Sequence, residues 1–304
     1  MDRFQEMQVF LAVAEEQGFA AAARRLSMSP PSVTRAVAAL EERIGTLLLP
    51  RTTRSVHITE AGQRYVEDCW RILAELEEAE ESAAGSHATP RGQLNITAPV
   101  LFGELFVTPL LVEYLNQQPA VQIKALLVDR VVSMVDEGID VAIRIGNLPD
   151  SGLHALKVGE VRRVICAAPS FLATHGRPTH PEQLREAQVV ASASSQLLSE
   201  WHFVDGDNAL SVRPQPRLVV TANQAAINAA CLGWGLTRVL SYQVADKVSK
   251  GELEIVLQDF EQPPLPIHVV YQEGRKIAAK VRTFVDFCAQ RLAQDPALNS
   301  PQQA

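Results

Sequence analysis

The chain has 304 residues, of which 47% are hydrophobic and 21% charged, and its formal net charge is -7. These proportions are typical of a globular protein with room for two or three domains. No segment reaches the roughly eighteen consecutive apolar residues of a membrane-spanning helix, which argues against a membrane protein. The N-terminus lacks the basic-then-apolar pattern of a secretion signal, so we expect the protein to be cytoplasmic.

The negative charge is concentrated in one segment. Residues 1–64 contain eight arginines and seven acidic residues, whereas residues 65–85 contain seven acidic residues and one arginine. The overall charge therefore does not exclude nucleic-acid binding by the N-terminal segment. A weakly basic segment predicts weak non-specific binding, with affinity recovered by dimerisation.

Residues 19–44 predict two helices separated by a tight turn. An alanine-rich helix beginning at Phe19 is broken at residues 27–29. Ser29 can cap the next helix, and Pro30 and Pro31 suit a first turn whose N–H groups lack helical partners. The apolar residues of this second helix recur every three or four positions and predict one buried stripe; they are Val33, Val37, Leu40 and Ile44.

The opposite face of the second helix is predicted to contact DNA. A helix-turn-helix pushes the N-terminus of its second helix against base edges in the major groove. The candidate DNA-binding residues at this end are Pro30, Pro31, Ser32, Thr34 and Arg35.

A basic hairpin is predicted to follow. Val56 and Ile58 alternate with polar residues, which indicates a strand of a small wing. Arg51, Thr52 and Arg54 are placed where a wing meets the phosphate backbone or the minor groove. The alternative is that these arginines are only solvated loop charges.

A family resemblance is carried by five short segments, at residues 21–26, 29–35, 40–41, 48–54 and 59–62. Together they resemble the DNA-binding signature of LysR-type transcriptional regulators. The resemblance implies an all-α winged helix-turn-helix and a linker helix, followed by an α/β two-lobed effector domain similar to type 2 periplasmic binding proteins. It also implies a bacterial regulator that binds double-stranded promoter or operator DNA and a small-molecule effector. The implied protein partners are a second copy in a homodimer, a homotetramer, and RNA polymerase.

The expected domain boundaries follow from this reading. Residues 1–59 form the DNA-binding domain, residues 60–88 the linker helix and hinge, and residues 89–304 the effector-binding domain. Within the last, the first lobe covers about 92–163 and 267–295, and the second about 164–266.

The linker helix carries its own apolar stripe. Val66, Cys69, Leu73 and Leu76 are spaced by three, four and three residues, as in a heptad seam, and Thr59 can cap the helix. Such a stripe packs either on its own domain or against a second chain. The resemblance favours pairing, since the family dimerises through this helix.

Beyond residue 92, strand-like and helical runs alternate, including a helix expected over Val131 to Glu137. The alternation predicts parallel strands joined by crossover helices. Ligands of such sheets bind beyond the carboxyl ends of the strands, near helix N-termini.

An anion site is predicted at these strand ends. Thr97 offers a hydroxyl next to a helix N-terminus, and Arg144 can grip a carboxylate with two hydrogen bonds. The effector is therefore expected to be a small organic anion. The alternatives are that Arg144 pairs with an acidic residue, that Asn223 merely caps its helix and that Trp201 is a core residue. The candidate effector-binding residues are Thr97, Ala98, Pro99, Arg144, Gly146, Trp201, Phe203 and Asn223.

Enzyme signatures are missing from the sequence: it has no nucleophile elbow, phosphate loop, dinucleotide fingerprint or metal-binding helix. We therefore expect no catalytic residues, no cofactor and no metal. The cysteines are far apart and are expected to be structural thiols; they are Cys69, Cys166, Cys231 and Cys288. A redox-sensing regulator and a solute-binding protein remain the alternative functions.

Overall fold

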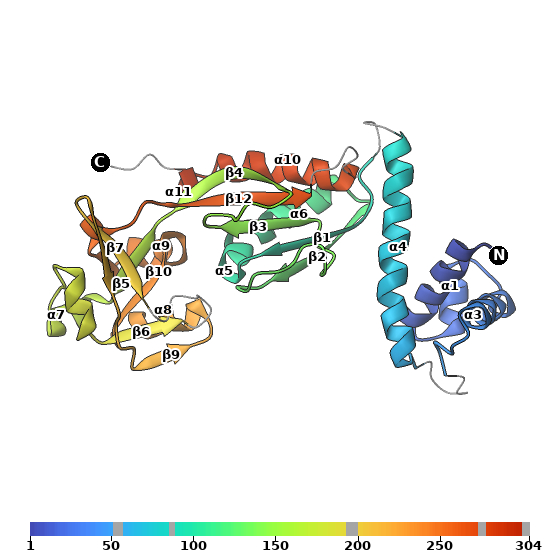
Figure 1. Cartoon of the computed structure of the whole chain (residues 1–304), viewed down its shortest axis with the longest axis horizontal. Helices are drawn as coiled ribbons and strands as arrows, with labels where there is room; N and C mark the ends of the chain where they lie inside the picture. Colours follow the sequence, from blue (N-terminus) through green and yellow to red (C-terminus); the bar gives the residue numbers. More distant parts are fainter. Residues whose placement is uncertain (51–56, 85–88, 193–199, 273–277, 300–304) are drawn as a thin grey trace. The chain divides into compact units, whose positions relative to one another are not determined.

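The computed structural model describes residues 1–50, 57–84, 89–192, 200–272 and 278–299. The chain forms two compact units, Met1–Ala88 and Thr89–Ala304 (Figure 1). The predicted wing residues Arg51, Thr52 and Arg54 lie outside the described residues.

The N-terminal unit is helical in its described part. Its helices are α1 (Arg3–Glu15), α2 (Phe19–Arg25), α3 (Pro30–Ile44) and α4 (Glu60–Ala84). They enclose one apolar core that contains Phe10 of α1, Val37 and Leu40 of α3, and Cys69 of α4. This confirms the predicted helix-turn-helix, with α2 and α3 as its two helices.

The turn between α2 and α3 depends on a residue with left-handed backbone geometry. Ser27 has φ +54°, and the next amide, Met28 N, donates to Ala23 O at 2.9 Å. Ser29 then caps α3, because its Oγ accepts from Ser32 N at 3.3 Å. The predicted stripe of α3 is buried except at its end: Ile44 is 38% exposed, since Gly45 ends the helix in the left-handed conformation.

The second unit contains two lobes, each built on a five-stranded sheet. In lobe I the strand order is β2-β1-β3-β12-β4. These strands are β1 (Gly92–Ala98), β2 (Val121–Leu127), β3 (Val141–Ile145), β4 (Leu153–Val161) and β12 (Leu265–Gln272). The helical segments of this lobe are α5 (Val100–Phe102), a π-helical turn (Gly103–Val107), α6 (Thr108–Gln117), α10 (Ala279–Ala293) and α11 (Pro296–Asn299).

Lobe II has the strand order β11-β5-β10-β6-β9 and a separate hairpin. Its sheet strands are β5 (Arg163–Ala167), β6 (Val189–Ser192), β9 (Leu218–Val220), β10 (Leu236–Leu240) and β11 (Glu254–Val256). The hairpin consists of β7 (Trp201–Asp205) and β8 (Asn208–Val212). The helices are α7 (Pro169–His175), α8 (Asn223–Cys231) and α9 (Ser241–Ser249), with 3₁₀ turns at Pro181–Arg185 and Gln258–Phe260.

The two-lobed α/β architecture and the predicted parallel strands are confirmed, but each sheet also contains antiparallel strands that were not predicted. Strand β1 is parallel to β2 and β3, whereas β12 is antiparallel to β3 and β4. In lobe II, β10 is parallel to β6 and antiparallel to β5. The antiparallel strands are those at the two crossovers, where the chain passes from one lobe to the other and back.

The helix predicted over Val131 to Glu137 was also wrong. This segment consists of turns, with Val132 and Met134 buried while Val131 and Val135 are 82% and 72% exposed. Burial of alternate residues is incompatible with the three-to-four spacing of a helix. The buried pair covers the face of the lobe I sheet that carries Ala142.

The lobes share a continuous apolar core. Tyr242 of α9 contacts Phe102 and Phe106 of lobe I, with ring centroids 5.4 and 5.8 Å apart. The carboxyl ends of the parallel strands of both lobes lead toward this junction, which is where the predicted ligand site falls.

Candidate functional site

The N-terminus of α3 presents a polar, solvent-exposed edge. Pro30, Pro31, Thr34 and Arg35 are exposed and Ser32 is half-buried, while Val33 and Leu40 on the opposite side are fully buried. The described structure thus brings these five candidate DNA-binding residues to one face.

Thr34 and Arg35, the two candidates for contacting base edges, use only part of their hydrogen-bonding capacity in local contacts. Thr34 Oγ1 donates to Pro30 O at 3.0 Å, which leaves the hydroxyl oxygen as an acceptor. Arg35 Nε donates to Pro31 O at 3.4 Å, and its Nη2 lies 3.5 Å from Ser32 Oγ. These long contacts hold the guanidinium loosely along the first turn, where it can extend toward a base edge.

A buried carboxylate that the sequence did not reveal supports this face from behind. Glu41 is 6% exposed, and its Oε1 accepts from Leu48 N at 2.8 Å and Leu49 N at 2.9 Å. These bonds fix the segment that leads into residues 51–56. The only sequence signal for the burial of Glu41 is its position in α3, one residue after Leu40 of the apolar stripe.

The same segment is held from the other side by the start of α4. Thr59 Oγ1 donates to Leu47 O at 3.0 Å and accepts from Gly62 N at 2.9 Å, so it caps α4 as predicted. Gly62 is required here, because a Cβ at this position would lie 2.3 Å from Leu48 O.

Most of the apolar stripe of α4 packs on its own domain, which was the alternative to a dimer seam. Cys69 and Leu73 are 0% and 8% exposed within the N-terminal core, and Val66 packs against the same core. Tyr65 contacts Phe10, with ring centroids 5.6 Å apart. Packing within the chain covers the stripe and leaves little of it for a partner.

In lobe I, Thr97 and Arg144 lie on the same face of adjacent strands. Thr97 is paired with Ala142, two residues before Arg144. The Thr97 side chain is not free, since Oγ1 donates to Leu126 O at 2.8 Å and the residue is 1% exposed. Arg144 Nη2 donates to Val132 O at 2.7 Å, and burial lowers its pKa.

Arg144 does not pair with an acidic residue among those described. Its closest candidate, Glu137, instead binds Arg130 through two hydrogen bonds of 2.6 and 2.7 Å. Next to it, Gly146 has φ +118° and donates to Pro266 O at 2.8 Å. This bond ties the end of β3 to the start of β12, beside the crossover.

A carboxylate of the chain itself occupies the helix N-terminus that follows Pro99. Asp129 Oδ1 accepts from Val100 N at 3.0 Å, and its Oδ2 lies 3.5 Å from Asn223 Nδ2. Asp129 belongs to lobe I and Asn223 begins α8 of lobe II. The helix N-terminus expected to bind an anion next to Thr97 is therefore occupied at Val100 N by a carboxylate of the chain itself.

Trp201 and Phe203 lie inside lobe II. Both are 4% exposed and belong to the core between the β7–β8 hairpin and the sheet. They flank the guanidinium of Arg238, whose Cζ lies 5.7 and 5.6 Å from the two ring centroids. Among the described residues, these two side chains make no hydrogen bond or ring contact with Thr97 or Arg144, so the described structure does not unite the predicted site residues in one pocket.

The cysteines are protonated thiols of low reactivity. Burial raises the pKa of Cys69 to about 11 and of Cys166 and Cys288 to about 12, and also raises that of the half-buried Cys231. A redox sensor needs an accessible thiolate. These environments favour the structural reading over redox sensing.

The described residues form neither a metal cluster nor a membrane-spanning helix. They contain no group of three or more histidine, cysteine or acidic side chains placed to hold a metal ion. None of their helices has both the length and the apolar character needed to span a membrane.

A helix-turn-helix unit joined to a two-lobed α/β unit defines a class of DNA-binding protein with a ligand-binding domain. Two family models match the chain accordingly. Residues 4–63 match the bacterial regulatory helix-turn-helix protein, lysR family, and residues 87–293 match the LysR substrate binding domain.

Relatives match over almost the whole length. An HTH-type transcriptional regulator of Xanthomonas campestris is 36% identical, covering 97% of this chain and 90% of the relative. The HTH-type transcriptional activator AaeR of Escherichia coli is 31% identical, covering 94% and 93%. The solved structure of CrgA, a LysR-type transcriptional regulator from Neisseria meningitidis, is 27% identical with a TM-score of 0.62, covering 95% and 99%.

The chain belongs to the LysR family. It is a DNA-binding transcriptional regulator with an effector-binding domain.

Proposed function

We propose that the protein binds operator DNA as a dimer through the N-terminus of α3, and that a small organic anion between the lobes sets its activity. The observation that carries the DNA-binding part is the exposed edge formed by Thr34 and Arg35 beside the capped start of α3. Because a transcriptional regulator acts on chromosomal DNA, we also propose that the protein is cytoplasmic and contacts RNA polymerase. Regulators of this class are generally not enzymes, and we propose no catalytic activity.

Arg35 is proposed to read a base. Arg35→Ala should weaken binding to an operator obtained by in vitro selection by about 1–3 kcal/mol, and binding to random duplex DNA much less. Arg64→Ala is the matched control, because Arg64 is an exposed arginine on α4 paired only with Glu60. If Arg35→Ala loses the same amount of affinity for selected and for random DNA, Arg35 does not recognise a base.

Arg54 is proposed to contact phosphate with Arg51 and Thr52. Arg54→Ala should weaken binding to all sequences alike and reduce the slope of log K against log salt concentration by about 0.9. A sequence-dependent loss without a change of slope would contradict this assignment.

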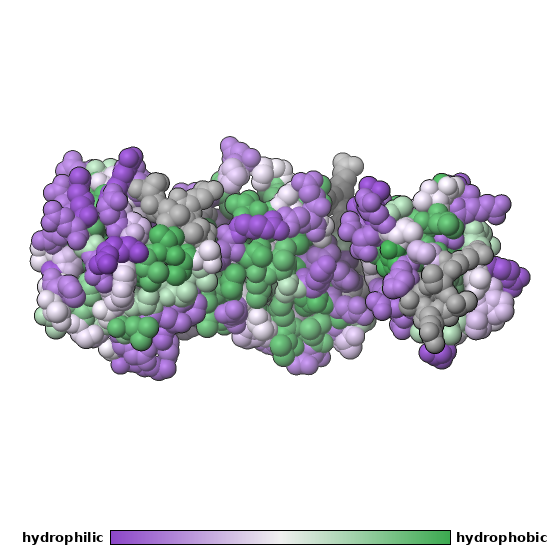
Figure 2. Space-filling view, turned by 90° about the horizontal axis from the view of Figure 1, so that it is seen from below, coloured by the Kyte–Doolittle hydropathy of each residue, from purple (hydrophilic) through white to green (hydrophobic). Residues whose placement is uncertain are grey.

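Dimerisation is proposed to use the face of α4 that does not pack on the N-terminal core. Trp70 lies on this face and is 41% exposed, which is unusual for so large an apolar side chain. Trp70→Glu should shift the sedimentation coefficient toward the monomer while leaving the unfolding of the N-terminal unit unchanged. An unchanged coefficient would remove α4 from the interface. Figure 2 shows apolar surface over lobe I in the middle of the view. This surface, and separately the 56% exposed Val112 of α6, support further association into a tetramer.

The anion is proposed to bind at the strand ends of lobe I and the start of α8. Arg144 supports this, since it is a half-buried cation without an ion pair among the described residues. Asp129 supports it as well, because its carboxylate already lies against Val100 N near Asn223. An effector carboxylate that binds at Val100 N displaces Asp129 and changes the contact of Asp129 with Asn223 of the other lobe. Effector binding is thereby coupled to the arrangement of the two lobes. The proposed contacts are Thr97, Ala98, Pro99, Arg144, Gly146 and Asn223, whereas Trp201 and Phe203 belong to the core of lobe II and are not part of this site.

A thermal-shift screen of small organic acids and their neutral amides tests this assignment. Acids should stabilise the effector-binding domain, and Arg144→Gln should abolish the stabilisation. A neutral compound that stabilises both versions equally, with no acid effective, would overturn the anion proposal and leave the regulator assignment intact.

A further inference from the structure

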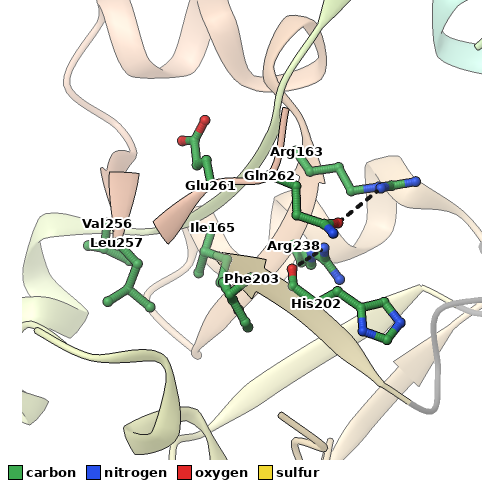
Figure 3. A pocket seen from close by; sticks show the side chains of 9 residues that line it. All are labelled: Arg163, Ile165, His202, Phe203, Arg238, Val256, Leu257, Glu261 and Gln262. Carbon is green, nitrogen blue, oxygen red and sulfur yellow. Dashed lines mark hydrogen bonds between the residues drawn. The ribbon is translucent and has the colours of Figure 1, made fainter. Parts of the chain in front are cut away.

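A second group of cations lies inside lobe II, away from the strand ends of lobe I. A hollow of about 240 Å³, which includes space open to solvent, is formed by β5, β10, β11, strand β7 of the hairpin and the returning crossover (Figure 3). Arg163 and Arg238 lie on one side of it, and apolar side chains including Ile165 and Leu257 lie on the other.

The two guanidinium groups are not neutralised by a carboxylate. Among the described residues, Arg238 Nη2 donates to His202 O at 3.1 Å, while Nη1 is buried without any hydrogen-bond partner. Arg163 Nη1 lies 3.5 Å from the neutral amide oxygen of Gln262. Unpaired buried donors on a charged group are costly, so their retention calls for a ligand.

The acidic residue of the hollow is already engaged elsewhere. Glu261 accepts two hydrogen bonds from Arg162, at 2.9 and 3.2 Å. Burial, together with the charge of the neighbouring Arg163, lowers the pKa of Arg238 to about 10, so each cation disfavours the charge of the other. The hollow therefore keeps an excess of positive charge.

From this arrangement we infer that the hollow is a separate binding site for a small carboxylic acid with an apolar body. The carboxylate accepts from Arg238 Nη1 and from Arg163, as the fork of a guanidinium favours. The apolar body lies against Phe203, Ile165 and Leu257. A bare inorganic anion would satisfy the arginines and leave this apolar wall unused.

Isothermal titration calorimetry of the full chain with 3-methylbutanoate, at ionic strength held constant with chloride, tests the site. The acid should bind saturably, whereas the isosteric amide 3-methylbutanamide and sulfate should bind at least tenfold more weakly. Arg163→Gln and Arg238→Gln should each weaken binding of the acid at least tenfold. Arg238→Gln also removes the contact of the guanidinium with Trp201 and Phe203 and can therefore prevent folding. In that case Arg163→Gln still tests the site.

Arg213→Gln is the matched control, because it removes the same charge from a side chain of lobe II that is 73% exposed and outside the hollow. It should bind the acid as the wild type does. Equal binding of acid and amide, unaltered binding by Arg163→Gln, or no saturable binding by the wild type would overturn the inference. Loss of binding in Arg144→Gln with retention in Arg163→Gln would also overturn it, and would place the acid in the cleft between the lobes instead.

Discussion

The buried carboxylate of Glu41 joins α3 to the segment leading into residues 51–56, and its removal should destabilise the N-terminal unit. Two backbone N–H groups, of Leu48 and Leu49, donate to its Oε1 at 2.8 and 2.9 Å. A hydrogen bond to a charged group contributes about 1.5–3 kcal/mol, and a buried N–H left unpaired adds its desolvation cost. Because water will reach part of the vacated space, we expect Glu41→Ala to lower the free energy of unfolding by about 3 kcal/mol.

Differential scanning calorimetry of the full chain measures this effect. For a unit of this size, such a loss lowers the Tm of the N-terminal transition by roughly 12–24 °C. Glu41→Gln should fall between the wild type and Glu41→Ala, since its amide oxygen accepts hydrogen bonds without the charge. Glu42→Ala is the matched control, because Glu42 is exposed at the next position of α3. Equal Tm values for Glu41→Ala and Glu42→Ala would refute the reasoning.

Three further outcomes are expected. Gly62→Ala should unfold or strongly destabilise the N-terminal unit in the same calorimetric scan, since its Cβ would lie 2.3 Å from Leu48 O. Burial raises the pKa of Cys166 and Cys288 to about 12, so both should react with a disulfide reagent below about pH 9 far more slowly in the native protein than in guanidinium. Burial also raises the pKa of Asp140, so the folded protein holds that proton more tightly than the unfolded chain, and the stability contributed by this group is lost as the pH rises through the raised value. In urea titrations, the free energy of unfolding of the wild type should therefore increase relative to that of Asp140→Asn as the pH falls from about 7 to 4.

The helix-turn-helix could be predicted because its signals are local. Ser29 caps α3, and Val33 and Leu40 are buried, all of which follow from residue type and spacing within a few turns. Spacing alone does not say what covers an apolar stripe. On α4 the same periodicity fits both a partner helix and the domain's own core, and the structure places Cys69 and Leu73 in the latter.

The effector-binding domain was predictable at the level of architecture but less so at its site. Strands such as β1 and β3 are signalled by their own apolar runs, whereas β7 and β8 contain charged and polar residues that hide their pairing. The approach of Arg163 to Arg238 depends on β5 lying antiparallel to β10, a register that joins distant segments. Asp129 reaches the helix after Pro99 by the same kind of non-local contact.

The packing of α4 also limits how a signal can reach the DNA. Thr59 caps α4 while bonding to Leu47 O, Gly62 admits close contact with Leu48, and Leu73 is embedded in the core of the helix-turn-helix. These contacts make the first half of α4 part of the same rigid body as α3, because shifting one against the other would expose buried apolar surface and break the cap. In the dimer proposed above, a change in the spacing of the two DNA-binding heads would therefore come from the way the two α4 helices cross, since the joint between each head and its own helix is fixed. A substitution on the exposed side of α4 that keeps an apolar ring and leaves the dimer intact, Trp70→Phe, should accordingly alter the preferred spacing of two half-sites more than the affinity for a single half-site.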